Sequence, residues 1–297
     1  MIDIRLKVFR SVAQNLSFTK AAKELYISQP AISKHIQELE QEYSTRLFDR
    51  MGSHIQLTRS GKLLLDHCEK ILQHYQQMDF EMHALHQKYS GELRIGASTT
   101  ISQYVIPEYI AKLLQAYPDL SVTMFSGNSR EIESELIMGR IDIGLVEGNI
   151  HQPELKYTPF EKDELVAIVG KDNPLAEQDE MGLEELKKQP IVLRELGSGT
   201  LDVIEYYLHQ KNIRLSDLNI VMHFGTTEGI KHFVKKSNSM GIVSIRSITE
   251  DLLRGEFKVI ELEGLHFERT FSIVEKHGNL LGPAKMIKES ITKSYNL

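Results

Sequence analysis

Polar side chains between residues 28 and 37 recur at the spacing of one helical face. Gln29, Ser33 and Gln37 stand four residues apart, with Lys34 beside them. Their amide and hydroxyl groups can donate and accept hydrogen bonds, and the lysine adds one cation. Such side chains contact base edges and phosphates when a helix lies in the major groove of DNA. The alternative is an ordinary solvated face of a three-helix scaffold.

Glycines and small polar residues fill five loops in the C-terminal two thirds of the chain. Glycine allows close approach to the backbone, and hydroxyls with helix-terminal amides donate hydrogen bonds to anions. Together at one sheet edge, these loops predict a site for a small anionic ligand, although each alone could be a plain helix cap. The candidate ligand-contacting residues are Ser98, Thr99, Thr100, Gly127, Asn128, Ser129, Glu147, Gly197, Ser198, Gly199, Thr200, Thr226 and Thr227.

Glu147 does not fit a simple anion site. Its negative charge would repel an anionic ligand unless the carboxyl is protonated, turned away or paired with a cationic group of the ligand. A ligand that bears an amino group therefore stays open.

The first candidate face needs a small helical domain to position it. Apolar residues of 4–40 recur at spacings of three and four, which predicts three short helices with Ser17 and Ser28 as N-caps of the second and third. Pro30 is tolerated in the first turn of the third helix. Residues 47–50 and 54–58, joined by a turn at 51–53, indicate a β-hairpin from which Arg50 could reach the phosphate backbone or the minor groove.

A helix of residues 59–88, with Thr58 as its N-cap, is predicted to follow. Apolar residues at heptad spacing along this helix predict a seam that packs against a second chain. The alternative is that the seam packs on the β-hairpin of the same chain. Cys68 is the sole cysteine and is expected to be buried and structural, while the histidines at 67, 74, 83 and 86 are expected on a solvated face. The seam residues are Leu64, Cys68, Ile71, Tyr75, Met78, Met82 and Leu85.

From residue 90 onward, short β-rich runs alternate with helical segments. Strands are expected at 93–97, 120–125, 141–146, 164–169, 190–194, 220–224 and 241–245, with helices at 105–117 and 130–139. This pattern predicts two α/β lobes hinged near 160–163 and 263–269. Ligands of open α/β sheets bind beyond the carboxyl ends of the strands, where the five polar loops fall.

The composition separates two regions of different charge. The 297 residues carry a formal net charge of -6, yet residues 1–90 hold 12 basic and 10 acidic side chains. No apolar run is long enough to span a membrane and the N-terminus lacks a signal-peptide pattern, so a cytoplasmic protein without membrane contact is expected. A single cysteine excludes an internal disulfide framework. No cofactor is expected.

Five segments, 17–22, 27–33, 39–40, 47–50 and 57–61, together resemble the LysR-type transcriptional regulators, motif for motif and in order. The C-terminal region resembles the effector domain of that family, itself similar to type 2 periplasmic binding proteins. Segments 127–129, 145–148 and 194–200 resemble the branch that regulates sulfur assimilation and carbon dioxide fixation. Departures are Tyr43-Ser44 for a usual Leu-Gly pair, Leu196 for a proline, and Leu201 for a basic residue, so that the site would depend on hydroxyls and amide dipoles.

The resemblance implies an α/β protein with an N-terminal winged helix-turn-helix (1–58), a long linker helix (59–89) and a two-lobed effector domain (90–297). Lobe I would comprise 90–161 and 267–297, and lobe II 162–266. It implies a homodimer or homotetramer that binds operator DNA and a small effector, an oxyanion or small acid. The alternative is a solute-binding protein or an enzyme, but no catalytic motif is found. The DNA-contacting residues would be Thr19, Lys20, Ser28, Gln29, Pro30, Ser33, Lys34, Gln37 and Arg50.

Overall fold

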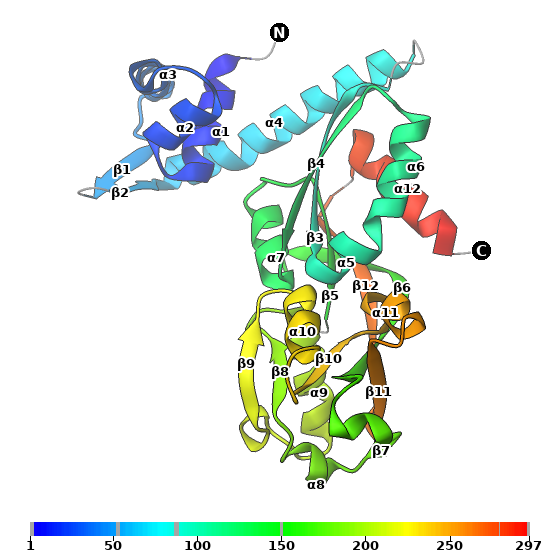
Figure 1. The fold of residues 1–297 in the computed structure, drawn as a ribbon. Helices are drawn as coiled ribbons and strands as arrows, with labels where there is room; N and C mark the ends of the chain where they lie inside the picture. The colour runs from blue at the N-terminus through cyan, green and yellow to red at the C-terminus, as the bar shows by residue number, and fades with distance from the viewer. Residues whose placement is uncertain (1–2, 52–53, 86–88, 149–150, 279, 296–297) are drawn as a thin grey trace. The chain divides into compact units, whose positions relative to one another are not determined.

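The structure of the protein is a computed structural model that describes residues 3–51, 54–85, 89–148, 151–278 and 280–295. The chain divides into two compact units. One is made mainly of residues 1–91 and the other of the rest of the chain apart from two short segments. Each unit is described separately, and Figure 1 shows their elements.

Three short helices and a hairpin build the N-terminal unit. They are α1 (Ile4–Asn15), α2 (Phe18–Glu24), α3 (Gln29–Glu42), β1 (Phe48–Met51) and β2 (His54–Leu57), and the long α4 (Arg59–Ala84) follows. The predicted N-caps are confirmed, since the side chains of Ser17, Ser28 and Thr58 accept hydrogen bonds from Lys20, Ala31 and Gly61 amides. The fold of this unit thus follows from local signals.

A single apolar core holds these helices together. Phe9 of α1, Ala21 of α2 and Ile32 of α3 are fully buried in it, and Phe48 of β1 closes it from the hairpin side. Small Ala21 and Ala22 leave room for the close crossing of α2 and α3. The hairpin is antiparallel, with Phe48 opposite Leu57. Residues 52–53 of its turn lie outside the described residues.

Ser44 shows how the chain replaces the usual glycine after α3. Its φ is 48°, in the left-handed region that glycine adopts without strain. The turn is closed by a hydrogen bond from the Ser44 amide to the Gln41 carbonyl, 3.1 Å long. The serine therefore keeps a left-handed turn, at a conformational cost that glycine would not carry.

The second unit contains two α/β lobes. Lobe I contains β3 (Gly91–Ser98), α5 (Thr99–Tyr104), α6 (Ile106–Ala116), β4 (Leu120–Gly127), α7 (Ser129–Ile137), β5 (Ile143–Glu147) and α12 (Gly282–Tyr295). Lobe II contains β7 (Glu180–Met181), α8 (Leu183–Leu186), β8 (Ile191–Arg194), α9 (Gly199–Gln210), β9 (Ile220–Phe224), α10 (Thr227–Val234), β10 (Met240–Ser244), α11 (Thr249–Leu253) and β11 (Phe257–Leu262). Three 3₁₀ turns lie at Pro174–Glu177, Leu215–Asp217 and Ile245–Ser247.

Two long strands run through both lobes. β6 (Leu155–Gly170) and β12 (Phe267–Lys276) pair antiparallel from Leu155 opposite Lys276 to Leu165 opposite Phe267, with a register shift after Phe271. The sheet order is β4-β3-β5-β12-β6-β10-β8-β9. The segments that the sequence indicates as hinges therefore lie on β6 and at the start of β12, within a continuous strand pair.

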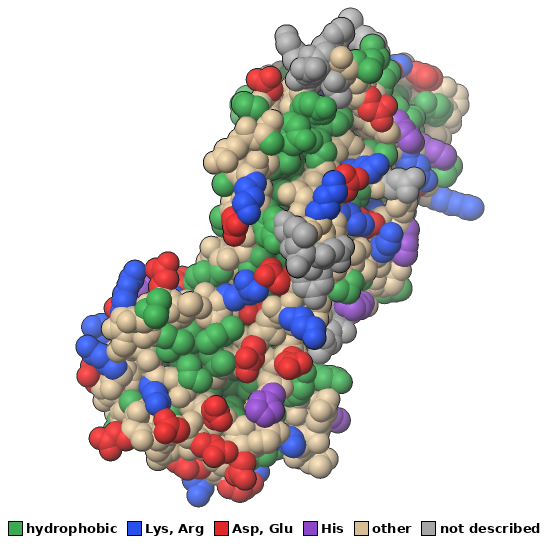
Figure 2. Space-filling model, turned by 90° about the vertical axis from the view of Figure 1, so that its right-hand side faces the viewer, with side chains coloured by type: hydrophobic (Ala, Val, Ile, Leu, Met, Phe, Trp, Pro, Cys, Tyr) green, Lys and Arg blue, Asp and Glu red, His purple; other side chains and the backbone are tan. Residues whose placement is uncertain are grey.

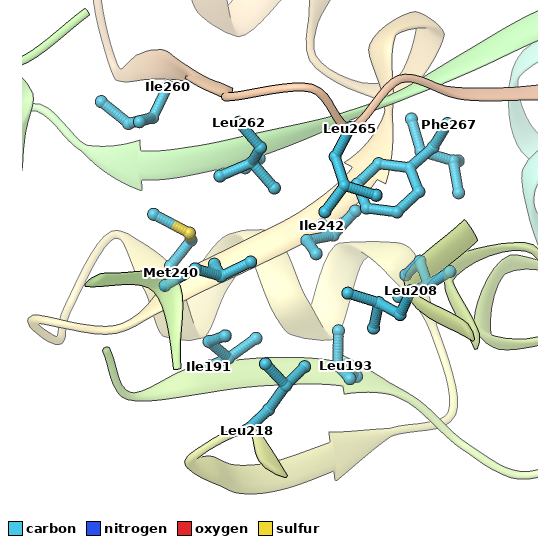
Figure 3. Close-up of a cluster of buried hydrophobic side chains, with 14 of the residues drawn as sticks. Ile191, Leu193, Leu208, Leu218, Met240, Ile242, Ile260, Leu262, Leu265 and Phe267 are labelled. Carbon is cyan, nitrogen blue, oxygen red and sulfur yellow. The ribbon is translucent and has the colours of Figure 1, made fainter. Parts of the chain in front are cut away.

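Each lobe has its own apolar core. In lobe II, side chains from β8, β10 and β11 face those of α9 and the segment before β12, as Figure 3 shows for Leu193, Ile242, Leu208 and Leu265. In lobe I, Ile95 and Ile143 of the parallel strands pack with Ile287 of α12. Because each core closes on itself, polar residues are left to form the contact between the lobes.

In the second unit, the sequence-based prediction placed seven strands near their observed positions but missed β7, β11 and β12, as well as all helices other than α6 and α7. In β12 the alternation of Phe267, Phe271 and Ile273 is interrupted by an inward-facing Arg269. A charged residue at a core position breaks the alternation of apolar and polar residues by which a strand is recognised in the sequence.

Charged side chains of both signs are scattered over the face shown in Figure 2, and acidic ones are numerous over lobe II at its lower end. Among the described residues, no helix combines the length and the apolar character needed to cross a bilayer.

Candidate functional site

The exposed face of α3 carries the residues predicted to contact DNA. Gln29, Lys34 and Gln37 are exposed, whereas the Ile32, Ile36 and Leu39 stripe is buried in the core. Gln29 Nε2 donates a hydrogen bond to Ser33 Oγ at 3.0 Å, which aligns these two polar groups along the helix. Pro30 is also exposed.

The other residues predicted to contact DNA lie at the helix starts and on the hairpin. Thr19 and Lys20 are exposed in the first turn of α2. The Oγ of Ser28 is occupied, because it accepts the Ala31 amide as the N-cap of α3. Arg50 belongs to β1, but its side chain lies outside the described residues.

A cavity of about 580 Å³ separates α3 from the hairpin. Ser33 and Gln37 line one side of it, and Asp49 and Gln56 the other. Arg46 also lines it, a cation that the sequence analysis missed because it precedes the hairpin in an irregular segment. Glu40 of α3 links the helix to the segment before the hairpin, because its Oε1 accepts a hydrogen bond from the Leu47 amide at 2.8 Å.

Tyr26 is a strongly exposed residue that the predicted set of DNA-contacting residues does not include. It stands in the turn between α2 and α3 with a φ of 54°, and 94% of its surface is exposed. A non-glycine residue in the left-handed region is uncommon, and in a turn next to a candidate binding helix it is a signal worth attention.

The predicted apolar seam of α4 divides into two parts. Cys68 is fully buried in the core of its own unit, where its Sγ donates a hydrogen bond to the Leu6 carbonyl at 3.2 Å, and Leu64 packs against the same core. Cys68 is therefore not available to a second chain, which corrects the seam prediction at this residue, whereas Leu64 is half-buried. Burial raises the pKa of the Cys68 thiol to about 11, and the expected structural role is confirmed.

The C-terminal part of the seam remains on the surface. Ile71, Met78, Met82 and Leu85 are exposed, the last with 76% of its surface, and Tyr75 is half-buried. Single apolar side chains on a surface are common, but four of them along one helix indicate an interaction surface.

The histidines of α4 only partly match the solvated face that the sequence predicts. His67 and His74 are exposed as expected, whereas His83 is half-buried. His86 lies outside the described residues.

In the second unit, a buried polar cluster forms where the lobes meet. We call it the interlobe cluster. Ser98 ends β3, Thr99 and Thr100 begin α5, and Glu147 ends β5, the strand paired with β3. From lobe II come Thr200 at the start of α9 and Arg194 at the end of β8. The two strands shared by both lobes add Asp163 and Arg269.

Arg269 lies at the centre of this cluster. Its Nε donates to Asp163 Oδ2 at 2.7 Å, its Nη1 to Thr200 Oγ1 at 2.9 Å, and its Nη2 to Thr100 Oγ1 at 3.4 Å. Nη1 also lies 3.5 Å from Glu147 Oε1. One guanidinium thus joins residues of both lobes through the hinge strand β12.

Arg194 provides a second buried cation. Its Nη1 donates to Thr99 Oγ1 at 2.5 Å, across the boundary between the lobes. Its other edge binds both carboxylate oxygens of Glu195, at 2.8 and 2.9 Å. Arg194 exposes 1% of its surface and Arg269 3%. The interlobe cluster therefore contains two buried arginines beside the hydroxyls that the sequence predicts, and each arginine is paired with a carboxylate.

Sequence reasoning missed both arginines as site residues. The basic residue that it found missing after the 194–200 segment is Leu201, which is buried in the core of lobe II. Leu196, in place of a proline, is exposed. The sequence did contain one signal for this role: Arg269 interrupts the alternating apolar residues of 267–273, as a charged residue at a core position does.

The remaining predicted ligand residues have mostly local contacts. Thr226 caps α10, Asn128 caps α7 by accepting a hydrogen bond from the Glu131 amide, and Ser198 caps α9. Ser129 donates from Oγ to the Glu147 carbonyl at 2.7 Å. Three other predicted residues are buried; they are Gly127, Gly197 and Thr227.

Gly199 shows how closely the lobes approach. A Cβ at this position would lie 1.9 Å from the Glu147 carbonyl oxygen, so that only glycine fits. A second lobe-to-lobe contact is the hydrogen bond from Tyr104 of α5 to Glu228 of α10. Burial opposes ionisation of Glu228, yet hydrogen bonds from Lys231 and Tyr104 lower its pKa below the usual value.

Two family matches agree with this division of the chain. Residues 4–62 match the bacterial regulatory helix-turn-helix protein, lysR family, and residues 86–285 match the LysR substrate binding domain. The chain belongs to the LysR family of transcriptional regulators. It is a DNA-binding regulator with an effector-binding domain, which confirms the fold class and function that the sequence predicts.

Curated relatives of this LysR-type regulator include CysL of Bacillus subtilis (strain 168), which is 32% identical over 269 residues. That match covers 91% of this chain and 89% of CysL. A probable RuBisCO transcriptional regulator of Cyanidioschyzon merolae is 33% identical over 268 residues, covering 89% of this chain and 88% of the relative. These relatives support the predicted sulfur and carbon-fixation branch.

Solved structures show the same fold. A full-length OxyR variant from Pseudomonas aeruginosa aligns with a TM-score of 0.71 and 20% identity, covering 99% of this LysR-type chain and 97% of that chain. The regulatory domain of Synechocystis PCC6803 CcmR, in complex with 2-PG, aligns with a TM-score of 0.63 and 22% identity, covering 69% and 98%.

Proposed function

We propose that this LysR-type regulator binds a dyad-symmetric operator as an oligomer and responds to a small anion held by the interlobe cluster. The observation that carries the proposal is the pair of buried arginines, Arg194 and Arg269, each donating to a threonine of lobe I. Buried cations are expensive unless they are paired and hydrogen-bonded. Placing two of them where the lobes meet is consistent with an anionic effector.

The carboxyl ends of β3, β5 and β8 carry the cluster, which is where open α/β sheets bind ligands. The N-terminus of the twelve-residue α9 adds backbone amides that favour negative charge. Two similar solved effector domains hold small molecules: that of CcmR holds 2-PG and that of QuiR holds shikimate.

The effector would act through the strand pair β6 and β12. A ligand that contacts both lobes favours the conformation in which the lobes are closest, and it shifts the equilibrium by its differential affinity for that state. Because Asp163 and Arg269 lie opposite each other on these strands, the ligand site and the predicted hinge share residues. Closure would thereby change the geometry of the oligomer and of the bound DNA.

On the DNA side, we assign base contacts to Gln29, Ser33 and Gln37 and a phosphate contact to Lys34. Thr19 and Lys20 would contact the backbone from the start of α2. The exposed half of the α4 seam, from Ile71 to Leu85, would contact a second chain. We further expect no catalytic turnover, and action in the cytoplasm, where the operator is found.

The test is calorimetric titration of the full-length protein with phosphate, sulfite, sulfate, thiosulfate, phosphorylated sugars and small carboxylic acids. We expect one class of anion to bind, and Arg269→Gln and Thr200→Ala to weaken that binding by tenfold or more. Thr292→Ala is the matched control, because this hydroxyl on α12 donates only to the Lys288 and Glu289 carbonyls. If no anion binds, or if Arg269→Gln binds as tightly as the wild type, the proposed site is wrong.

Operator binding is tested separately by electrophoretic mobility shift. The full-length protein should bind a dyad-containing promoter fragment from its own locus at least a hundredfold more tightly than random DNA. Equal affinity for both fragments would refute sequence-specific binding by this chain.

A further inference from the structure

Glu147 is the carboxylate of the interlobe cluster that contacts hydroxyl groups at the end of β3 and the start of α5 as well as a guanidinium. Ser98 Oγ donates to its Oε2, and Thr100 Oγ1 donates to its Oε1 at 3.5 Å. Arg269 Nη1 lies 3.5 Å from the same Oε1. The side chain exposes 2% of its surface, so it is turned into the cluster and not away from it.

The charges around Glu147 do not balance. Arg269 pairs with Asp163, Arg194 with Glu195, and Arg246 with Glu161 at 2.5 Å. Glu147 therefore shares the guanidinium of Arg269 with Asp163, which lies closer to it, at 2.7 Å against 3.5 Å, and which also has Arg246 at 3.8 Å. Together with Glu195, Glu161 and Arg246, the cluster has four acidic and three basic side chains, and so one excess negative charge.

Glu147 is also held in place. Its carbonyl oxygen accepts from Ser129 Oγ at 2.7 Å and lies against Gly199 of the other lobe. Its strand, β5, is paired on both sides, with β3 and with β12. A ligand at this site must accommodate the carboxylate where it lies.

We propose that Glu147 selects an anion that carries its own hydrogen-bond donor. This inference rests on the proposed anionic effector and names its class. The effector accepts hydrogen bonds from the arginines, threonines and α9 amides while donating one to Glu147. A monoprotonated oxyanion such as hydrogenphosphate or hydrogensulfite has this chemistry, and so does the ammonium group of a zwitterionic amino acid.

The reason is that a carboxylate and a ligand can form a hydrogen bond only if one of them supplies the donor. An ionised carboxylate only accepts hydrogen bonds, and a fully deprotonated oxyanion such as sulfate also only accepts. Placed together in a buried site, the two leave acceptors without a donor and repel each other. A site built to hydrogen-bond a ligand hydroxyl rejects an analogue that lacks it far more strongly than an apolar pocket rejects a change of size. Sulfate and hydrogenphosphate have the same shape, so the proton alone distinguishes them.

The experiment titrates full-length protein with phosphate, sulfite, sulfate and L-serine, slightly below neutral pH. We expect phosphate or sulfite to bind at least about 100-fold more tightly than sulfate. In Glu147→Gln, whose amide can donate, the preference should fall to less than tenfold because sulfate binding improves. Selective binding of L-serine would assign the donor to an ammonium group and would also support the proposal.

Glu133→Gln is the matched control. Glu133 is a buried glutamate of the same lobe, on α7, but its Oε1 accepts from Tyr157 and not from a residue of the cluster. This variant should keep the wild-type preference for proton-bearing anions.

The outcomes separate this inference from the proposed function. Sulfate binding as tightly as phosphate to the wild type would overturn the role of Glu147 while leaving the anionic effector intact. That comparison needs no variant, so it holds even if Glu147→Gln fails to fold. Binding of none of the four probes would overturn this inference, and the wider anion panel would then decide the proposed function.

Discussion

Removal of the Arg269 guanidinium should strongly destabilise the folded protein, because this one side chain pairs with two buried carboxylates. In Arg269→Met, the carboxylates of Asp163 and Glu147 lose their shared cation, and both are buried. Breaking a buried ion pair from one side costs about 3–5 kcal/mol, because the remaining charge stays buried without compensation. A domain of this size loses roughly 2–4 °C of Tm per kcal/mol, so we expect a decrease of about 6–20 °C.

A double variant isolates the cause. Asp163 still accepts a hydrogen bond from Ser244 Oγ at 2.7 Å, so Asp163→Asn keeps that partner while removing the charge. Arg269→Met combined with Asp163→Asn should therefore recover about half of the lost stability, because one uncompensated charge is gone. The surface pair of Arg254 and Glu250 is the control: Arg254→Met should change stability by less than about 1 kcal/mol.

Thermal unfolding of the full-length protein, followed by calorimetry, measures these differences. The reasoning is refuted if Arg269→Met unfolds within about 2 °C of the wild type. It is also refuted if the added Asp163→Asn substitution lowers Tm further instead of restoring part of it.

Four other predictions test separate parts of the structure. Ser44→Gly should stabilise the N-terminal unit by up to about 1 kcal/mol in urea unfolding, because glycine removes the left-handed strain; a destabilised variant would contradict it. With a thiol pKa of about 11, Cys68 should stay neutral at pH 7 and react with a thiol reagent only above about pH 10 or after unfolding; rapid labelling of the native protein would show that it is accessible. Lys34→Ala should weaken binding to all DNA and reduce the salt slope by about one, whereas Gln29→Ala should cost about 1–3 kcal/mol at one operator position; equal effects would refute the assignment of contacts. Met82→Glu on the exposed part of α4 should shift the oligomer toward monomer in analytical ultracentrifugation, while an unchanged sedimentation coefficient would place the interface elsewhere.

The N-terminal unit was largely predictable because its signals are local. Ser17, Ser28 and Thr58 cap helices only a few residues away, and the apolar spacing of α3 separates its buried face from its polar face. The same logic failed for β12, whose pairing partner β6 lies about a hundred residues earlier in the chain. Strand pairing over such a distance leaves little trace in a short window of sequence.

For the candidate site, the amino-acid sequence by itself determined the polar loops, the unexpected acid at Glu147 and the family. Those are properties of residue type and spacing. Only the tertiary structure decided that Arg269 and Arg194 lie among these loops, and that Cys68 belongs to the core of its own unit. The physical reason is that a buried charge is stable only beside partners brought from elsewhere in the chain, such as Asp163 and Thr100 for Arg269. The sequence names the charge, but folding supplies its partners and therefore its role.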